Sequence, residues 1–166
     1  MKRIRFLLVA AIAAIALLPG TAVAAGTTER VSISTAGVQA NSASADPAIS
    51  ADGRFAAFDS DATNLDPADT DVFADVFVRD LQANTTILVS RATGPSGVKG
   101  DWSSWQPAIS ADGRFVAFGS SATNLDPADT DGVDDVFVRD LGTDTTVLVS
   151  RSSSGVKGNG LSTSAT

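Results

Sequence analysis

The feature that most constrains this chain is an internal repeat of 60 residues. Residues 47–91 return as residues 107–151 with 35 identities in 45 positions and no gap. Two units this similar indicate duplication of one structural unit. The repeat therefore sets the frame within which secondary structure is predicted. The differences fall in predicted turns or keep an apolar residue, as in Ala56 against Val116 and Ile87 against Val147. The repeated pattern is therefore that of a core.

Each unit is expected to form four short strands. In the first copy they are residues 47–50, 54–58, 75–81 and 85–91, with equivalents 60 positions later. Asp52-Gly53 predicts a tight turn between the first two, because glycine accepts a positive φ. In the second strand Phe115 and Ala117 alternate with Val116 and Phe118, so both faces are apolar. A strand buried on both faces has to lie between two other layers.

Three repeated motifs resemble the TolB-like, WD40-like (PD40) β-propeller repeat. They are Pro-Ala-Ile-Ser-Ala-Asp-Gly-Arg-Phe-Val-Ala-Phe, Asp-Val-Phe-Val-Arg-Asp-Leu and Thr-Thr-Val-Leu-Val-Ser, at residues 107–118, 135–141 and 145–150. The resemblance implies an all-β fold of tandem four-stranded antiparallel blades, each needing a neighbour on both sides. The period is longer than the roughly 40 to 45 residues of a WD40 blade. The excess lies in residues 59–74 and 119–134.

The expected organisation is a signal peptide at residues 1–24, a leading strand and linker at 25–46, blade 1 at 47–106, and blade 2 with a trailing linker at 107–166. Residues 27–32 match the fourth strand at 145–150, so the chain is expected to begin on a fourth strand. Two blades and one strand are fewer than the four to eight blades of a closed propeller. We expect a fragment of a longer propeller; the alternatives are self-assembly of several chains through blade faces, or a β-sandwich or solenoid.

The N-terminus predicts export. Lys2, Arg3 and Arg5 precede a 13-residue apolar run at residues 6–18, and residues 22–24 are Ala-Val-Ala, typical of a secretory signal. The run is too short for a membrane-spanning helix, so no span is expected after cleavage. The remaining chain has 9 basic and 19 acidic residues, a net charge of −10. Such a charge disfavours nucleic acid as a partner, and the predicted location is extracytoplasmic, in the periplasm, in the cell envelope or secreted.

Aspartates cluster in the long loop of each unit. Carboxylates at short spacing are the ligands that Ca²⁺ requires, but the spacing does not fit an EF-hand loop, and such aspartates more often form turns and keep a loop soluble. Calcium is therefore the one candidate cofactor. The candidate ligands are Asp126, Asp129, Asp131 and Asp134 in the second unit and Asp66, Asp69 and Asp71 in the first.

Trp102 and Trp105 break the repeat, since no tryptophan stands at the matching positions of the other linkers. Two indoles in a loop can stack on a glycan or a peptide, with Asp101 and Gln106 adding polar contacts. The competing interpretation is that both indoles fill the gap between adjacent blades.

The residue inventory argues against an enzyme. The chain has no His, Cys or Tyr, which excludes a Ser-His-Asp triad, a thiol nucleophile and a His-ligated zinc site. We expect a noncatalytic binding or scaffold module whose partner is a protein or a glycan. The alternative is a calcium-stabilised structural or adhesive repeat.

Overall fold

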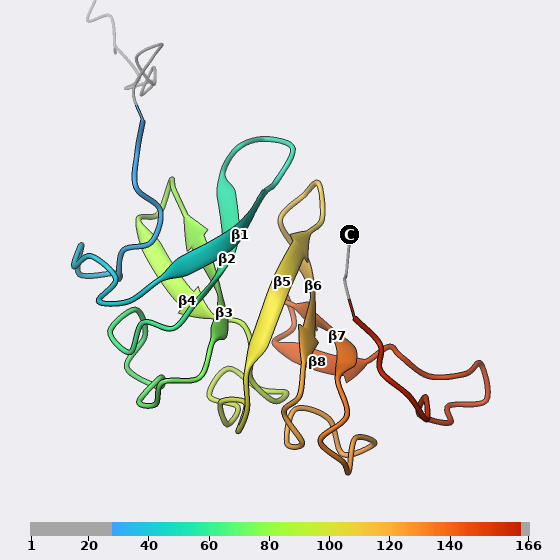
Figure 1. Cartoon of the computed structure of the whole chain (residues 1–166). Coiled ribbons are helices and arrows are strands. Elements are labelled where there is room, and N and C mark those ends of the chain that lie inside the picture. The colour runs from blue at the N-terminus through green and yellow to red at the C-terminus, as the bar shows by residue number, and fades with distance from the viewer. Residues whose placement is uncertain (1–27, 164–166) are drawn as a thin grey trace, which may run out of the picture.

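The computed structural model describes residues 28–163, so the predicted signal peptide lies outside the described residues. Two four-stranded antiparallel sheets follow one another along the chain, each with its strands paired in sequence order. Blade 1 contains β1 (Ser44–Ile49), β2 (Phe55–Ser60), β3 (Asp75–Asp80) and β4 (Thr85–Leu88); blade 2 contains β5 (Ser104–Ile109), β6 (Phe115–Ser120), β7 (Asp135–Asp140) and β8 (Thr145–Leu148). The two sheets stand side by side (Figure 1). In the described range no helix is long and apolar enough to cross a membrane.

The first strand of each blade begins earlier than its sequence predicts. A proline lacks the N–H that a ladder needs and normally limits a strand, yet β1 runs through Pro47 from Ser44. A bulge accommodates it: the pairing register with β2 shifts between Ala45 and Ala48, and Asp46 takes a φ of 46°. Gln106 repeats this in β5 with a φ of 49°. The predicted turn at Gly53 is confirmed, with a φ of 71°.

The leading strand expected at residues 27–32 is not a strand in the part of it that the structure describes. Residues 28–43 contain a single isolated bridge, Ile33 with Gln39. A fourth strand pairs with a third strand, and both third strands of the described chain, β3 and β7, already have a partner on each side. The fourth strands also end earlier than expected, because the N–H groups of Val89 and Ser90 both donate to the carbonyl of Val76 and stop the regular ladder.

Each sheet is apolar on both faces, as the sequence predicts. We call the face of a blade that turns towards the next blade its forward face and the opposite one its rear face. Rows of paired residues place Ala57, Val76 and Val78 on the forward face of blade 1, with Phe58 and Phe77 on its rear face. All five are at most 2% exposed. Burial of both faces is therefore confirmed for blade 1; in blade 2 the rear face is buried, with Val116 and Phe118 at 0% exposure, whereas Phe115 of the forward face is 40% exposed.

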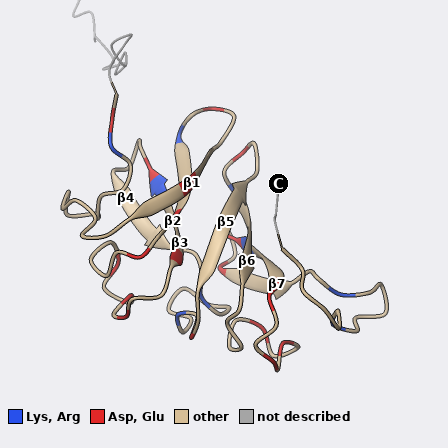
Figure 2. Ribbon diagram, in the orientation of Figure 1, with Lys and Arg blue, Asp and Glu red and all other residues tan. Residues whose placement is uncertain are grey.

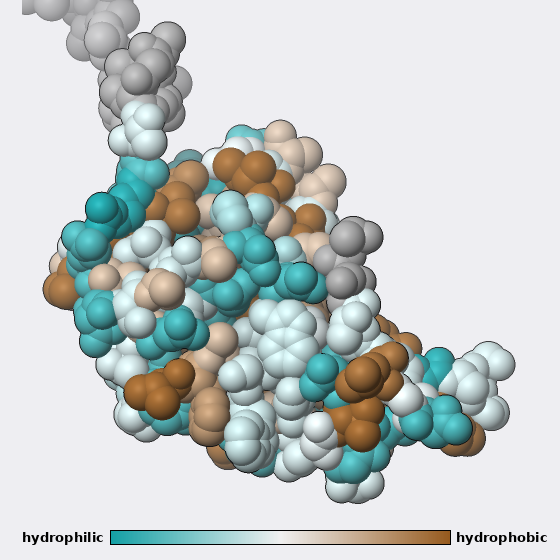
Figure 3. All heavy atoms as spheres, in the orientation of Figure 1, coloured by the Kyte–Doolittle hydropathy of each residue, from teal (hydrophilic) through white to brown (hydrophobic). Residues whose placement is uncertain are grey.

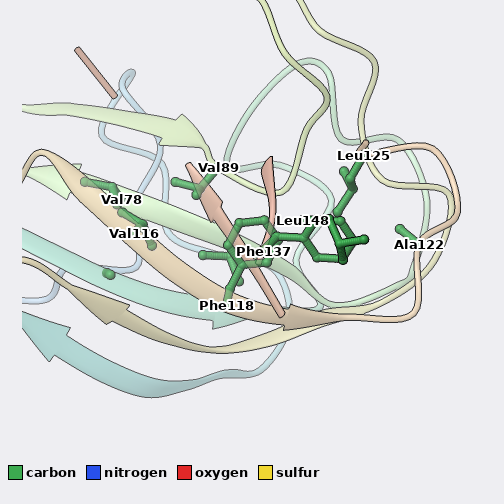
Figure 4. Packing of buried hydrophobic residues seen from close by; sticks show 10 residues of the cluster. Val78, Val89, Val116, Phe118, Ala122, Leu125, Phe137 and Leu148 are labelled. Carbon is green, nitrogen blue, oxygen red and sulfur yellow. The ribbon is translucent and has the colours of Figure 1, made fainter. Parts of the chain in front are cut away.

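One core joins the two blades. It packs the forward face of blade 1, including Val78 and Val89, against the rear face of blade 2, including Val116, Phe118 and Phe137 (Figure 4). A second, smaller core lies on the rear face of blade 1, where Val31 and Ala40 of the N-terminal segment cover Phe58 and Phe77. The fold is therefore a pair of tandem propeller blades stacked face to face.

The forward face of blade 2 is uncovered in the described part of the chain. Val149 is 43% exposed, whereas the matching Val89 of blade 1 is completely buried. Val136 and Val138 are half-buried, whereas the matching Val76 and Val78 are at most 1% exposed; Val147, at 39%, shows no such difference, because the matching Ile87 is 43% exposed. The same apolar surface is thus covered in one copy of the repeat and open in the other.

Candidate functional site

A short hairpin follows the fourth-strand position of every repeat. We name these hairpins clasp 1 (residues 33–41), clasp 2 (91–101) and clasp 3 (151–159). Each is closed by one isolated bridge, Ile33 with Gln39, Arg91 with Lys99, and Arg151 with Lys157. Clasps 1 and 2 each reach forward to the blade that follows them in the chain, so they link consecutive units.

Clasp 2 binds the rear face of blade 2 through a threonine pair. The Thr146 N–H donates to the Thr93 hydroxyl, which in turn donates to the Thr146 carbonyl, both at 3.1 Å. The Thr146 hydroxyl donates to the carbonyl of Arg91, and the buried guanidinium of Arg139 donates to the carbonyls of Arg91 and Ala92.

At its far end clasp 2 meets the β6–β7 loop. Asn124 donates its amide to the Lys99 carbonyl at 2.8 Å, and Thr123 donates its N–H and its hydroxyl to the carboxylate of Asp101. The connection between the blades is therefore polar at both ends and apolar in the centre.

Clasp 1 makes the same contacts on blade 1. Thr35 pairs with Thr86 through two hydrogen bonds of 3.2 and 3.0 Å, and the Thr86 hydroxyl donates to the Ile33 carbonyl. Asn64 donates its amide to the carbonyl of Gln39 at 2.9 Å. The rear face of a blade is thus a receptor for a clasp, with a threonine and an asparagine at fixed positions.

Clasp 3 has the shape of the other two but no receptor within residues 28–163. Its hairpin is formed, since Ser152 donates to Val156 and Gly158 donates to Ser150 through the backbone. Its path is also the same, because the Ser162 N–H donates to the carbonyl of Asp134 as Ser104 does to that of Ala74. Together with the forward face of blade 2 it forms a continuous candidate binding surface.

The predicted acidic loops contain two equivalent carboxylate clusters. In blade 1 oxygens of Asp69, Asp71 and Asp75 lie within 4.8 Å of one another, and in blade 2 those of Asp129, Asp131 and Asp135 do the same. Each cluster surrounds a lysine from the clasp that follows: the Lys99 ammonium lies 2.7 Å from Asp75 and 3.1 Å from Asp71. These loops form the red lower rim in Figure 2.

Lys157 repeats the arrangement at 2.7 Å from Asp135, 2.8 Å from Asp131 and 3.7 Å from Asp129. Sequence reasoning gave these lysines no role, although both follow a Gly-Val pair at the same place in the repeat. That recurrence is the signal that would have revealed the pairing.

The carboxylate of Asp69 is the least satisfied group of the cluster. It is 2% exposed, and neither oxygen has a hydrogen-bond partner. Burial, followed by the charge of Asp75, raises the pKa of Asp69 to about 7. Burial also raises the pKa of Asp75 to about 6, although Lys99 and Ser90 bind that carboxylate. In blade 2 burial raises the pKa of Asp129.

The other predicted ligands do not join these clusters. Asp66 and Asp126 accept hydrogen bonds from backbone N–H groups two residues on and from the fourth strand at Leu88 and Leu148. Asp134 accepts a hydrogen bond from the Ser121 hydroxyl. These three residues hold the loop against its own blade, as the turn interpretation of the aspartates predicts.

The two tryptophans pack against different partners. The Trp102 ring lies 4.9 Å from that of Phe73, in the long loop of blade 1, and Trp102 remains 53% exposed. Trp105 lies flat over Gly119 of the neighbouring strand, where a Cβ would come within 2.9 Å of its indole nitrogen. Because Trp105 shares a row with Gly119 and Val136, it belongs to the forward face of blade 2.

The arginines next to this region form exposed ion pairs. Arg54 and Arg114 each hold a carboxylate through two guanidinium nitrogens, Asp80 and Asp140 respectively. Hydrogen bonds from the guanidinium keep the pKa of Asp80 and of Asp140 below the usual range. Exposed pairs of this kind fix a turn and contribute little to stability.

Comparison with solved structures finds similarity between part of this chain and β-propeller proteins. No protein-family model and no curated protein matches the sequence. A putative TolB from Agrobacterium tumefaciens is 17% identical over 66% of this chain and 31% of that chain, with a TM-score of 0.42. TolB from Acinetobacter baumannii is 18% identical over 64% and 21%, with a TM-score of 0.39. The β-propeller domain of the Trilobed protease from Pyrococcus furiosus, described as having an open velcro topology, is 22% identical over 66% and 28%, with a TM-score of 0.42.

The aligned part of this chain spans less than a third of each of these structures. The strand order and the two-sided burial come from the chain's own structure, and the matches agree with them. The prediction of two tandem four-stranded antiparallel blades is confirmed by the chain's own strand order and by the core between the two sheets, and the structures to which the chain is similar are two TolB proteins and a β-propeller domain.

Proposed function

We propose that this protein is a noncatalytic extracytoplasmic module that binds another protein through the forward face of blade 2. The observation that carries this proposal is the contrast between Val89, fully buried, and Val149, 43% exposed, at the same position of the repeat. An apolar sheet face in water is unfavourable by roughly 25 cal/mol for each Å² left uncovered. A face with this pattern is a binding surface for another β-layer.

The residues around the face suit a protein better than a glycan. Val136, Val138, Val147 and Val149 present aliphatic side chains, and Trp105 lies along the same surface. Glycan sites instead combine an exposed ring with several polar groups that hold hydroxyls. Trp102, with its ring stacked on Phe73, is the remaining glycan candidate and lies outside this face.

The absence of His, Cys and Tyr from the sequence supports a noncatalytic role. The basic and apolar N-terminus supports export. Both parts of the proposal rest on the sequence and not on the matches to solved structures.

A photo-crosslinking amino acid at position 149 tests the binding surface. In the native extracytoplasmic setting, we expect Val149 to give protein adducts that a probe at Val72 does not give. Val72 is the matched control because it is 78% exposed and lies on a loop outside the face. Equal labelling at positions 149 and 72 would refute the proposal that the forward face of blade 2 is the binding surface.

A calcium-stabilised structural or adhesive repeat is the second candidate. The observation that favours it is the buried carboxylate of Asp69, whose two oxygens have no hydrogen-bond partner. Against it, the ammonium of Lys99 already lies 2.7 Å from Asp75 in the same cluster. Thermal unfolding with calcium and then with a chelator decides between them, because a higher midpoint in calcium would favour the calcium repeat.

A further inference from the structure

The contact between blade 1 and blade 2 has two halves, and the outer surfaces of the two blades repeat these halves. Between the blades, a forward face and a clasp meet a rear face. The forward face of blade 2 and clasp 3 are one unused half. The rear face of blade 1 is the other half, and the N-terminal segment covers it only in part: Ile49 is 63% exposed there, whereas the matching Ile109 packs against the shared core.

The hydrogen-bonding groups of clasp 3 match those of the clasps in use. Ser153 stands where Thr35 and Thr93 carry their hydroxyls, and Asn159 stands where Asn41 and Asp101 bind the long loop. Ser153 is exposed and has no hydrogen bond within the described residues. A blade that offers a threonine, as Thr86 does, would satisfy it.

In a second copy of the chain, that threonine is already engaged by clasp 1. Clasp 1 and an incoming clasp 3 would both bind Thr86 and the Asn64 amide, so they compete for one receptor. Of the two clasps, only clasp 3 is attached to an open sheet face, the forward face of blade 2. Clasp 1 and the residues just before it cover the rear face with only Ala40 and Val31, whereas clasp 3 is continuous in the chain with the valines of blade 2.

Clasp 1 also fits its receptor less closely than clasp 2 does. The groove between clasp 1 and residues 63–67 has a volume of about 600 Å³, and the equivalent groove at clasp 2 has about 290 Å³. Clasp 2 is two residues longer and fills more of the space. A loosely packed segment gives up fewer dispersion contacts when it leaves.

We propose that the forward face of blade 2 and clasp 3 dock onto the rear face of blade 1 of a second copy of this chain and displace its clasp 1. The inference deepens the proposed function and rests on it, since it names the bound protein. Contacts of this head-to-tail kind close into a ring when the rotation allows.

Three matched hydroxyl variants of the mature chain, residues 25–166, test the exchange by sedimentation velocity. Thr35→Ala weakens clasp 1 and should strengthen association about three- to tenfold, the effect of one or two hydrogen bonds. Ser153→Ala weakens clasp 3 and should reduce association by a similar factor. Thr93→Ala, at the internal clasp 2, is the control and should leave association unchanged.

Two further measurements keep the test decisive if a variant folds poorly. Val149→Glu should abolish association while Val72→Glu does not. In hydrogen exchange of the unmodified chain, raising the protein concentration should speed exchange in residues 33–41 and slow it in residues 151–159. Slowing in both segments would mean contact without displacement and would overturn the proposal.

The proposal also fails if Thr35→Ala and Thr93→Ala have equal effects on association, or if every variant stays monomeric at all concentrations. Crosslinks from position 149 that reach only other proteins would overturn it as well, but would leave the proposed binding function in place. Crosslinked adducts of twice the chain mass would support both the proposed binding function and the docking of a second copy.

Discussion

Replacing Asp69 by asparagine should change how the stability of the protein depends on pH. Asp69 is 2% exposed, and burial raises its pKa from 3.8 to about 7. The folded protein therefore holds this proton more tightly than the unfolded chain does. The stabilisation from this group is fully present below pH 3.8 and is lost as the pH rises to about 7.

The size of the effect follows from the pKa shift. Each pKa unit corresponds to about 1.4 kcal/mol. The raised pKa of Asp69 therefore lowers the free energy of unfolding by roughly 1.5 kcal/mol at pH 5 and roughly 4 kcal/mol at pH 8, relative to its value at low pH. Asparagine has nearly the same shape and does not ionise. We therefore expect Asp69→Asn to gain about 2 to 3 kcal/mol relative to the parent between pH 5 and pH 8.

Urea denaturation of both proteins at a series of pH values measures this gain. The amide has a desolvation cost of its own, so the change with pH, and not the difference at one pH, is the informative quantity. Asp61→Asn, in an exposed loop, controls for the loss of one negative charge. Asp129→Asn should show the same sign in blade 2. Parallel stability profiles for the parent and Asp69→Asn would refute the reasoning.

Four other substitutions have defined outcomes. Lys99→Met should lower the free energy of unfolding at pH 8 by about 3 to 5 kcal/mol, because it leaves the buried Asp75 carboxylate without its ion-pair partner, and should make the thermal midpoint respond to calcium. Trp105→Ala should cost about 2 kcal/mol by urea denaturation and Trp102→Ala about 1 kcal/mol, since Trp102 is already half exposed. Arg114→Ala should leave the thermal midpoint nearly unchanged at physiological salt, because its ion pair is exposed.

The fold was predictable because its main determinant is local and repeated. Alternation of apolar residues fixed which side chains share a face, and duplication showed that both faces are core. The bulge at Asp46 and Gln106 was less accessible, because it depends on how the strand passes a proline, which periodicity does not describe. The strand expected at residues 27–32 is not formed over residues 28–32, the part of it that the structure describes, because similarity to a strand does not supply a pairing partner.

The candidate sites were predictable only in part. Sequence clustering led to Asp69, Asp71, Asp129 and Asp131, and the structure brings each pair together with a further aspartate. It did not lead to the lysine of each cluster. In the first cluster that lysine is Lys99, which lies 24 residues after Asp75 in the chain. Proximity of that kind is set by the path of the clasp, and no spacing rule for metal ligands contains it. The exposed apolar residues come from both blades and their loops, and on the face of the molecule in Figure 3 they appear as several separate brown patches.

The extra length of the repeat has a structural reason in these contacts. Residues beyond a minimal four-stranded blade lie in the long loop and in the clasp, and these two segments bind each other across consecutive units through Asn64 and Gln39 and again through Asn124 and Lys99. The second of these contacts holds blade 2 to blade 1. The two described blades therefore keep a defined structure while one apolar face stays open, and that is the face that we propose binds another blade.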